Sequence, residues 1–146
     1  TTPTDEQLHR VTEKTPLFRN IYVKNLVSRN ARRAMFFNGL PEMNIENINL
    51  ENAFITSRYG AELSESTDIS FKNVTVITEE GPAFQFSNVK NFSSEGLGFD
   101  KETSEKMIEI EGKKTTGMVF TGLSEDLVKI TPDVDKNQVL FNEINE

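Results

Sequence analysis

The chain has 146 residues and a formal charge of −7, with 16 Lys and Arg against 23 Asp and Glu. That acidic balance argues against a nucleic-acid partner, because phosphate contacts need a basic surface. Cysteine is absent from the sequence, which excludes disulfides, thiolate metal sites and cysteine nucleophiles. No apolar run approaches the roughly 18 residues that a membrane-spanning helix needs. The length predicts one domain.

Residues 4–14 are predicted to be either a short capping helix or a loose tail. Thr4 and Gln7 have the spacing of a capping box, and Leu8 and Val11 fall on one helical face. The alternative follows from the usual disorder of chain ends. We therefore separate an N-terminal stretch, residues 1–14, from residues 15–146, where a repeat dominates.

A six-residue phrase recurs five times from residue 21 onward, at residues 21–26, 48–53, 69–74, 92–97 and 118–123. It reads apolar, any, apolar, any, Asn or Gly, apolar, with Ser94 in the second apolar place of the fourth copy. Successive copies begin 27, 21, 23 and 26 residues apart. A spacing in the twenties is the length of one solenoid coil, so the repeat predicts the fold before local propensity is considered.

The fifth place of the phrase indicates that the coil is built from strands. Alternating apolar residues point two side chains inward from a short strand, which must then turn sharply. Asn and Gly tolerate positive φ most readily, so we expect one left-handed residue in each coil. In the three Asn coils the amides are expected to stack as an asparagine ladder. The five positions are Asn25, Asn52, Asn73, Gly96 and Gly122.

A second apolar segment precedes each later copy of the phrase, at residues 34–37, 61–63, 83–86 and 107–110. Each coil therefore carries at least two strands, and the sequence predicts an all-β parallel β-helix of about five coils. The eleven Phe residues suit aromatic columns inside such a coil. Pro132 and Asp133 break the pattern near the end, and residues 139–141 are expected to close the final coil.

Three stretches, residues 15–25, 33–43 and 45–52, resemble the bacterial polygalacturonases, the pectin-degrading enzymes of glycoside hydrolase family 28. Residues 18–21, Phe-Arg-Asn-Ile, and residues 39–43, Gly-Leu-Pro-Glu-Met, are the most specific. The resemblance extends over roughly residues 15–125. It implies a right-handed single-stranded parallel β-helix, pectin or galacturonan as the substrate, and an extracellular or periplasmic location. Neither a cofactor nor a metal is expected.

The catalytic motifs of that family are missing from the sequence. Inverting hydrolases need a carboxylic acid and a carboxylate about 6.5 to 9.5 Å apart, and the family supplies them through Asn-Thr-Asp, Asp-Asp, Gly-His-Gly and Arg-Ile-Lys motifs. None of the four occurs here, and the single histidine, His9, lies outside the coils. We therefore predict no catalytic residue, and the chain resembles the C-terminal portion of such an enzyme.

Five residues are candidates for contact with an acidic polysaccharide. Arg29, Arg32 and Arg33 lie between two predicted strands and could hold uronate carboxylates through bidentate hydrogen bonds, or could form a solvated basic turn. Glu42 lies in a turn that the resemblance singles out, although an exposed acidic face is the simpler explanation. Tyr22 points outward from its strand, where it could stack on a sugar ring or pack laterally.

Asp133 and Asp135 form a weak calcium-like pair, for which a polar turn is the simpler explanation.

Three functions remain open at this point. The first is the C-terminal β-helix segment of a pectin-degrading hydrolase, inactive by itself. The second is a non-catalytic module that binds acidic polysaccharide. The third is a structural or interaction solenoid, whose open N-terminal end exposes strand edges that residues 1–14 would cap or a second chain would pair with.

Overall fold

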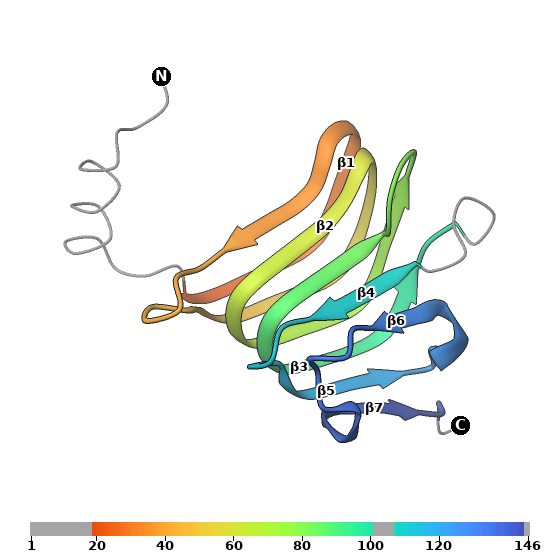
Figure 1. Ribbon diagram of the computed structural model, residues 1–146. Coiled ribbons are helices and arrows are strands. Elements are labelled where there is room, and N and C mark those ends of the chain that lie inside the picture. Colours follow the sequence, from red (N-terminus) through yellow and green to blue (C-terminus); the bar gives the residue numbers. More distant parts are fainter. Residues whose placement is uncertain (1–18, 101–106, 145–146) are drawn as a thin grey trace.

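Parallel strands wound in successive coils make up almost all of the computed structural model, which describes residues 19–100 and 107–144 (Figure 1). The helix predicted for residues 4–14 and His9 lie outside these ranges. Two 3₁₀ helices of one turn each, η1 and η2, interrupt the last coils. The elements are β1 (Arg19–Asn38), β2 (Ile45–Thr78), β3 (Phe84–Gly98), β4 (Ile108–Glu111), β5 (Thr116–Thr121), η1 (Glu125–Leu127), β6 (Val128–Ile130), η2 (Lys136–Gln138) and β7 (Val139–Asn142).

Copies of the phrase stack on one another in parallel register. Ile21 of β1 pairs with Ile48 of β2, and the same register continues from β2 to β3, from β3 to β5 and from β5 to β7. The last step pairs Met118 with Val139, so residues 139–141 add a rung to the stack, as expected. These pairings confirm the parallel β-helix.

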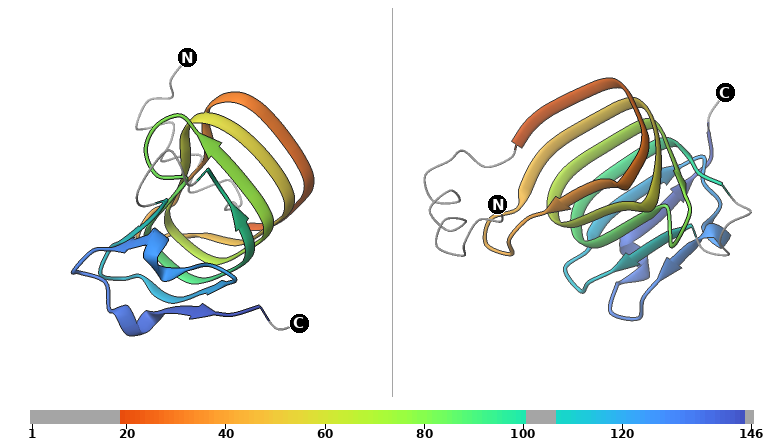
Figure 2. Two further views of the ribbon diagram at one scale, coloured as in Figure 1. Left: turned by 90° about the vertical axis from the view of Figure 1, so that its right-hand side faces the viewer. Right: turned by 90° about the horizontal axis from the view of Figure 1, so that it is seen from above.

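The apolar segments before the phrase form a second stack, with the sheet order β1-β2-β3-β4-β6. Its successive partners are Met35, Ala61, Phe84, Ile108 and Val128. The strand β6 is an addition to the strands expected from the sequence. β1 and β2 are long because they continue around the corners of the coil, and the views in Figure 2 show the chain closing around its interior.

Two left-handed residues bracket the phrase strand in every coil. The expected positions, Asn25, Asn52, Asn73, Gly96 and Gly122, have φ between 53° and 79°. A second column, which the sequence analysis missed, lies five residues earlier in each coil and has φ between 55° and 61°. Its members are Asn20, Asn47, Asp68, Asn91 and Gly117. Each phrase strand is thus held between two sharp turns at a fixed spacing.

Side-chain amides connect the turns of neighbouring coils. The Asn52 Nδ2 donates to Asn25 Oδ1 at 3.2 Å, and the Asn73 Nδ2 donates to Asn52 Oδ1 at 3.3 Å, which is the expected ladder. In the second column, the Asn47 Nδ2 donates to Asn20 Oδ1 at 2.8 Å. The Asn91 Nδ2 donates to the Asp68 carboxylate in the same way. These bonds tie the coils together at their corners.

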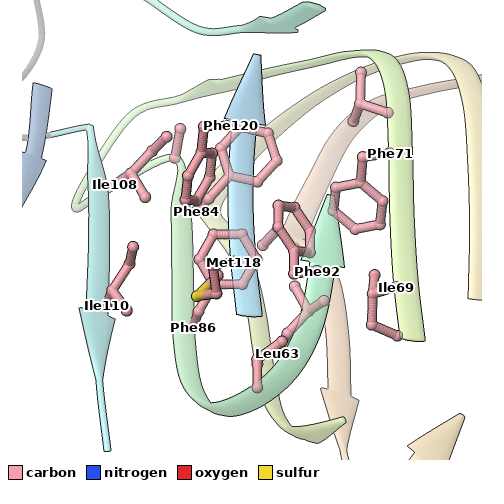
Figure 3. Close-up of a cluster of buried hydrophobic side chains, with 14 of the residues drawn as sticks. Leu63, Ile69, Phe71, Phe84, Phe86, Phe92, Ile108, Ile110, Met118 and Phe120 are labelled. Atoms are coloured by element: carbon pink, nitrogen blue, oxygen red, sulfur yellow. The ribbon is translucent and has the colours of Figure 1, made fainter. Parts of the chain in front are cut away.

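Phenylalanine rings fill the interior of the middle coils (Figure 3). The ring centroids of Phe86 and Phe92 lie 4.7 Å apart, and those of Phe92 and Phe120 lie 5.4 Å apart. Phe141 of β7 stacks on Phe120 at 5.6 Å, which extends the column to the last rung. Burying each such ring contributes about 1.5 to 3 kcal/mol, so the column is a main source of stability.

The first coil is less buried than the coils that follow. Val23 and Leu26 are 36% and 37% exposed, whereas their register partners Leu50 and Ala53 are 6% and 4% exposed. β1 and β7 lie at opposite ends of the stack (Figure 2). The inward positions of β1 therefore lie at the end of the described stack, while those of β2 are enclosed by coils on both sides.

Candidate functional site

A hollow of about 550 Å³ crosses three successive rungs on the flank of the β-helix. One rung belongs to β1 and two belong to β2, which passes the site twice. The hollow lies beside the left-handed turn at Asn30, which has φ 58°. Its lining residues are Asn30, Ala31, Arg32, Thr56, Ser57, Arg58, Ile77, Thr78 and Glu79.

A change of register between β1 and β2 occurs at this place. Ser28 pairs with Ile55, but Ala31 pairs with Ser57, so β1 has one more residue than β2 across the turn. Such a bulge bends the strand and re-aims the side chains that follow it. The backbone N–H of Asn30 donates to Thr56 Oγ1 at 2.9 Å, which fixes the bulged turn against the next coil.

Arg32 and Arg58 occupy equivalent places on neighbouring rungs of the hollow. Their flanking residues pair in register, Ala31 with Ser57 and Arg33 with Tyr59. The Arg58 Nε lies 2.8 Å from a carboxylate oxygen of Glu80, and this hydrogen bond raises the pKa of Arg58. Arg32 forms no ion pair within the described residues.

The other two predicted arginines lie near the same turn but outside the hollow. The Arg29 guanidinium lies over the Phe54 ring, 5.4 Å from its centroid. Arg33 contacts Glu62 at 3.3 Å and lies over the Phe36 ring at 4.7 Å. Arg33 also lines a separate hollow of about 170 Å³. The structure therefore brings Arg32, and neither Arg29 nor Arg33, into the lining of the larger hollow.

Arg58 is the residue of this site that the sequence analysis missed. It lies 26 residues after Arg32, close to the spacing of the first two phrase copies. Alignment of the two coils by their repeat would have placed the two arginines side by side.

Tyr22 and Glu42 do not line the hollow. Tyr22 is 61% exposed, and its hydroxyl donates to Glu51. That bond lowers the pKa of Glu51 and raises the pKa of Tyr22. Glu42 lies in a tight turn closed by backbone hydrogen bonds between Leu40 and Met43, about 3 Å long in both directions. The loop after β1, which holds Glu42, and the bend halfway along β1, beside which the hollow lies, are at opposite ends of the coil in Figure 1.

The Asp133 and Asp135 side chains accept hydrogen bonds that hold the last turns of the described chain. Asp133 accepts a hydrogen bond from the Thr131 hydroxyl, which is the main reason that the pKa of Asp133 lies below its usual range, and it also accepts from the backbone N–H of Gly112 at 3.2 Å. Asp135 accepts from the backbone N–H of Asn137 at 2.9 Å and so caps η2. Over residues 19–100 and 107–144 no group of three or more His, Asp or Glu side chains could hold a metal ion.

The fold and the hollow define a parallel β-helix protein with a basic hollow on its flank. No protein-family model matches the sequence, and none of the curated proteins matches it. Among solved structures, the chain is similar to a crystal structure described as a putative glycosyl hydrolase from Parabacteroides merdae ATCC 43184. The TM-score is 0.56 at 11% sequence identity, with 95% of this chain and 89% of that chain covered. At this identity the similarity is one of fold.

The part of the chain that the structure describes contains no helix long and apolar enough to span a membrane.

Proposed function

We propose that this chain is a β-helical segment of a glycoside hydrolase of the polygalacturonase type, which acts on pectin outside the cytoplasm. The observation that carries the proposal is the parallel β-helix over the residues where the family resemblance is found. Ile21, Ile48 and Ile69 begin the first three copies of the phrase; Ile21 lies in the most specific stretch, residues 18–21, and Ile48 lies in the stretch of residues 45–52. The fold shared with a structure described as a putative glycosyl hydrolase supports the same class of enzyme.

The chain by itself is proposed to lack hydrolytic activity. An inverting hydrolase needs one carboxyl group whose pKa is raised, so that it can protonate the leaving oxygen. Hydrogen bonds hold the pKa values of Glu51 and Asp133 below their usual range, which is the wrong direction for that role. Glu62 and Glu80 are engaged with arginines. The family's catalytic motifs are absent from the sequence.

A reducing-sugar assay on polygalacturonate tests both parts of the proposal. The assay is run on this chain alone and on the complete product of the gene that encodes it, with a neutral polysaccharide as the substrate control. We expect the complete product to release reducing ends from polygalacturonate and this chain alone to release none. Release by this chain alone would overturn the proposed inactivity. No release by the complete product would overturn the proposed enzyme class.

A further inference from the structure

We propose that the hollow lined by Arg32 and Arg58 binds a carboxylate-bearing sugar unit, with the Arg32 guanidinium as the carboxylate ligand. The choice of sugar rests on the proposed function, whereas the choice of carboxylate rests on the hollow itself. This places a polysaccharide-binding site on the flank of the coil, made by the corner turn of β1 and two passes of β2.

Charge at the hollow is the first argument. Arg32, Arg58 and Glu80 follow one another on three rungs, because Arg58 is in register with Arg32 and the Glu80 N–H donates to the Arg58 carbonyl oxygen at 2.9 Å. Rungs are about 4.8 Å apart, so Arg32 and Arg58 extend from neighbouring rungs, and of the two only Arg58 is paired with a carboxylate within the described residues. Arg32 is therefore the arginine of the hollow that a bound anion would pair with.

Arg32 has the geometry for this role. It lines the hollow and forms no ion pair within the residues that the structure describes. A guanidinium presents five N–H donors in a planar fork that matches a carboxylate through two parallel hydrogen bonds. Glu79 also lines the hollow, and its carboxylate would repel a ligand that carries negative charge on several sides. A sugar unit with a single carboxylate directed at Arg32 would pair with the guanidinium and would keep its uncharged part near Glu79.

The walls of the hollow suit the rest of a sugar ring. The Thr56 hydroxyl accepts from Asn30 N–H and keeps its own proton for a ligand oxygen. The Ser57 hydroxyl donates to the Tyr59 carbonyl oxygen at 2.6 Å, so this hydrogen bond holds the wall and uses the hydroxyl proton. Ile77 adds an apolar part to the lining. A volume of about 550 Å³ falls within the range of small-molecule sites, which extends from about 300 to 1,000 Å³.

Calorimetric titration of this chain with trigalacturonate tests the proposal. Two other probes separate the possible sources of binding: a neutral galactose trimer lacks the carboxylates, and inorganic phosphate lacks the sugar. We expect binding of trigalacturonate and no heat from either other probe. No binding of trigalacturonate would overturn the proposal. Phosphate binding as tight as trigalacturonate binding would show an anion site without a role for the sugar, and would overturn it as well.

Variants assign the binding to the hollow. Arg32→Gln should weaken trigalacturonate binding by about tenfold or more, because charge-assisted hydrogen bonds are lost. Arg32→Lys should recover part of the affinity, because it keeps the charge without the fork. Arg19→Gln is the matched control, since Arg19 is an exposed arginine of the same strand that does not line the hollow. An equal loss in both glutamine variants would overturn the site assignment.

The result is separable from that of the hydrolysis assay. If the complete gene product cleaves polygalacturonate and this chain binds no trigalacturonate, the flank site is wrong and the proposed enzyme class stands. If this chain binds trigalacturonate through Arg32 and the complete product cleaves nothing, the binding site stands and the enzyme class is wrong.

Discussion

At the scale of single residues, one backbone conformation decides which amino acids each corner of the coil accepts. The left-handed region is cheap for Gly and moderately cheap for Asn, which explains their exchange along the column from Asn25 to Gly122. Glu65 lies at another corner, in line with Asn88 and Gly112 of later coils, and has φ 48° although it is neither Asn nor Gly. Its carboxylate accepts a hydrogen bond from Asn88 Nδ2 at 2.9 Å, which ties this corner to the next coil.

The sequence predicted one of the two left-handed columns that bracket the phrase strand, and the reason is physical. Asn25 and its equivalents end an apolar alternation, so the demand for a sharp turn was visible. Asn20 and its equivalents precede the first apolar residue, where no pattern requires a turn, and Asp68 conceals the regularity of that column. Hydrogen bonding between Asn91 and Asp68 shows that an aspartate can fill the same place.

Substitution of Asn52 separates the backbone and side-chain contributions of the ladder. Asn52→Ala places a residue with a Cβ at φ 54°, which costs about 1 to 2 kcal/mol. It also removes two ladder hydrogen bonds, worth about 0.5 to 1.5 kcal/mol each. Asn52→Gly keeps the conformation and loses only the bonds. We expect urea unfolding to rank the free energies of unfolding as wild type, then Asn52→Gly, then Asn52→Ala.

Equal stability of the two Asn52 variants would contradict the conformational part of this account. A glycine variant as stable as the wild type would contradict the contribution of the amides.

The residues of the proposed binding site were only partly predictable at this scale. Arg29, Arg32 and Arg33 were singled out by composition, but which of them enters the hollow depends on a bulge between Ser28 and Ala31. An extra residue in one strand leaves no mark on the hydrophobic pattern, so the direction of each arginine could not be read from the sequence.

At the scale of elements, contact between successive rungs limits which side chains fit at the corners of the coil. Gly60 is one example, because a Cβ there would lie 2.2 Å from the Pro82 carbonyl oxygen and 2.4 Å from that of Ala83. The backbone N–H of Ala61 donates to the Ala83 carbonyl oxygen at 2.8 Å, which holds the two segments together. Gly81 differs, since it has φ +75° and a Cβ at its position would meet no other atom within 4 Å.

Gly60 and Gly81 therefore should respond differently to alanine. Gly60→Ala forces backbone atoms apart, and we expect it to destabilise the protein by about 3 kcal/mol or more. Gly81→Ala carries only the cost of a left-handed alanine, about 1 to 2 kcal/mol. Thermal unfolding of the two variants checks the order. A Gly60 variant as stable as the Gly81 variant would show that the rungs separate easily at this corner.

The strands themselves were largely predictable from the sequence. Alternation of apolar residues marked the phrase strands and the segments before them, and the pairing of Ile21 with Ile48 follows that pattern. β6 (Val128–Ile130) was missed because three residues are too short to show a period. It is recognised only through its pairing with β4, where Val128 lies beside Ile108.

At the scale of the whole molecule, burial and aromatic contact concentrate in the middle coils. Phe86 is fully buried and has ring neighbours at Phe84, Phe92 and Phe120. Phe37 of the first coil, which is in register with Phe86 through Leu63, is only partly buried. The number of coils followed from counting copies of the phrase. The uneven burial did not follow from it, because a repeat gives every coil the same pattern wherever it lies in the stack.

Two phenylalanine substitutions measure that unevenness. Phe86→Ala should lower the free energy of unfolding by about 3 to 5 kcal/mol, because it removes a buried ring from a close-packed column. Phe37→Ala is the matched comparison, because Phe37 holds the same register place in the first coil, and we expect a smaller loss of about 1 to 3 kcal/mol, since that ring is only partly buried. Chemical denaturation of both variants provides the measurement. Similar losses would indicate that stability is shared evenly along the stack.

The fixed distance between the two left-handed corners has a consequence for how such a chain can change in length. Coils here span 21 to 27 residues between phrase starts, yet five residues always separate the corner before a phrase strand from the corner after it. Length differences are absorbed outside the strand, in segments such as residues 39–44, and the inward alternation is undisturbed. Whole coils can therefore be duplicated, removed or exchanged between proteins of this fold as units. The corner residues fix the cross-section of the coil, and the loops outside the phrase strand can vary in length.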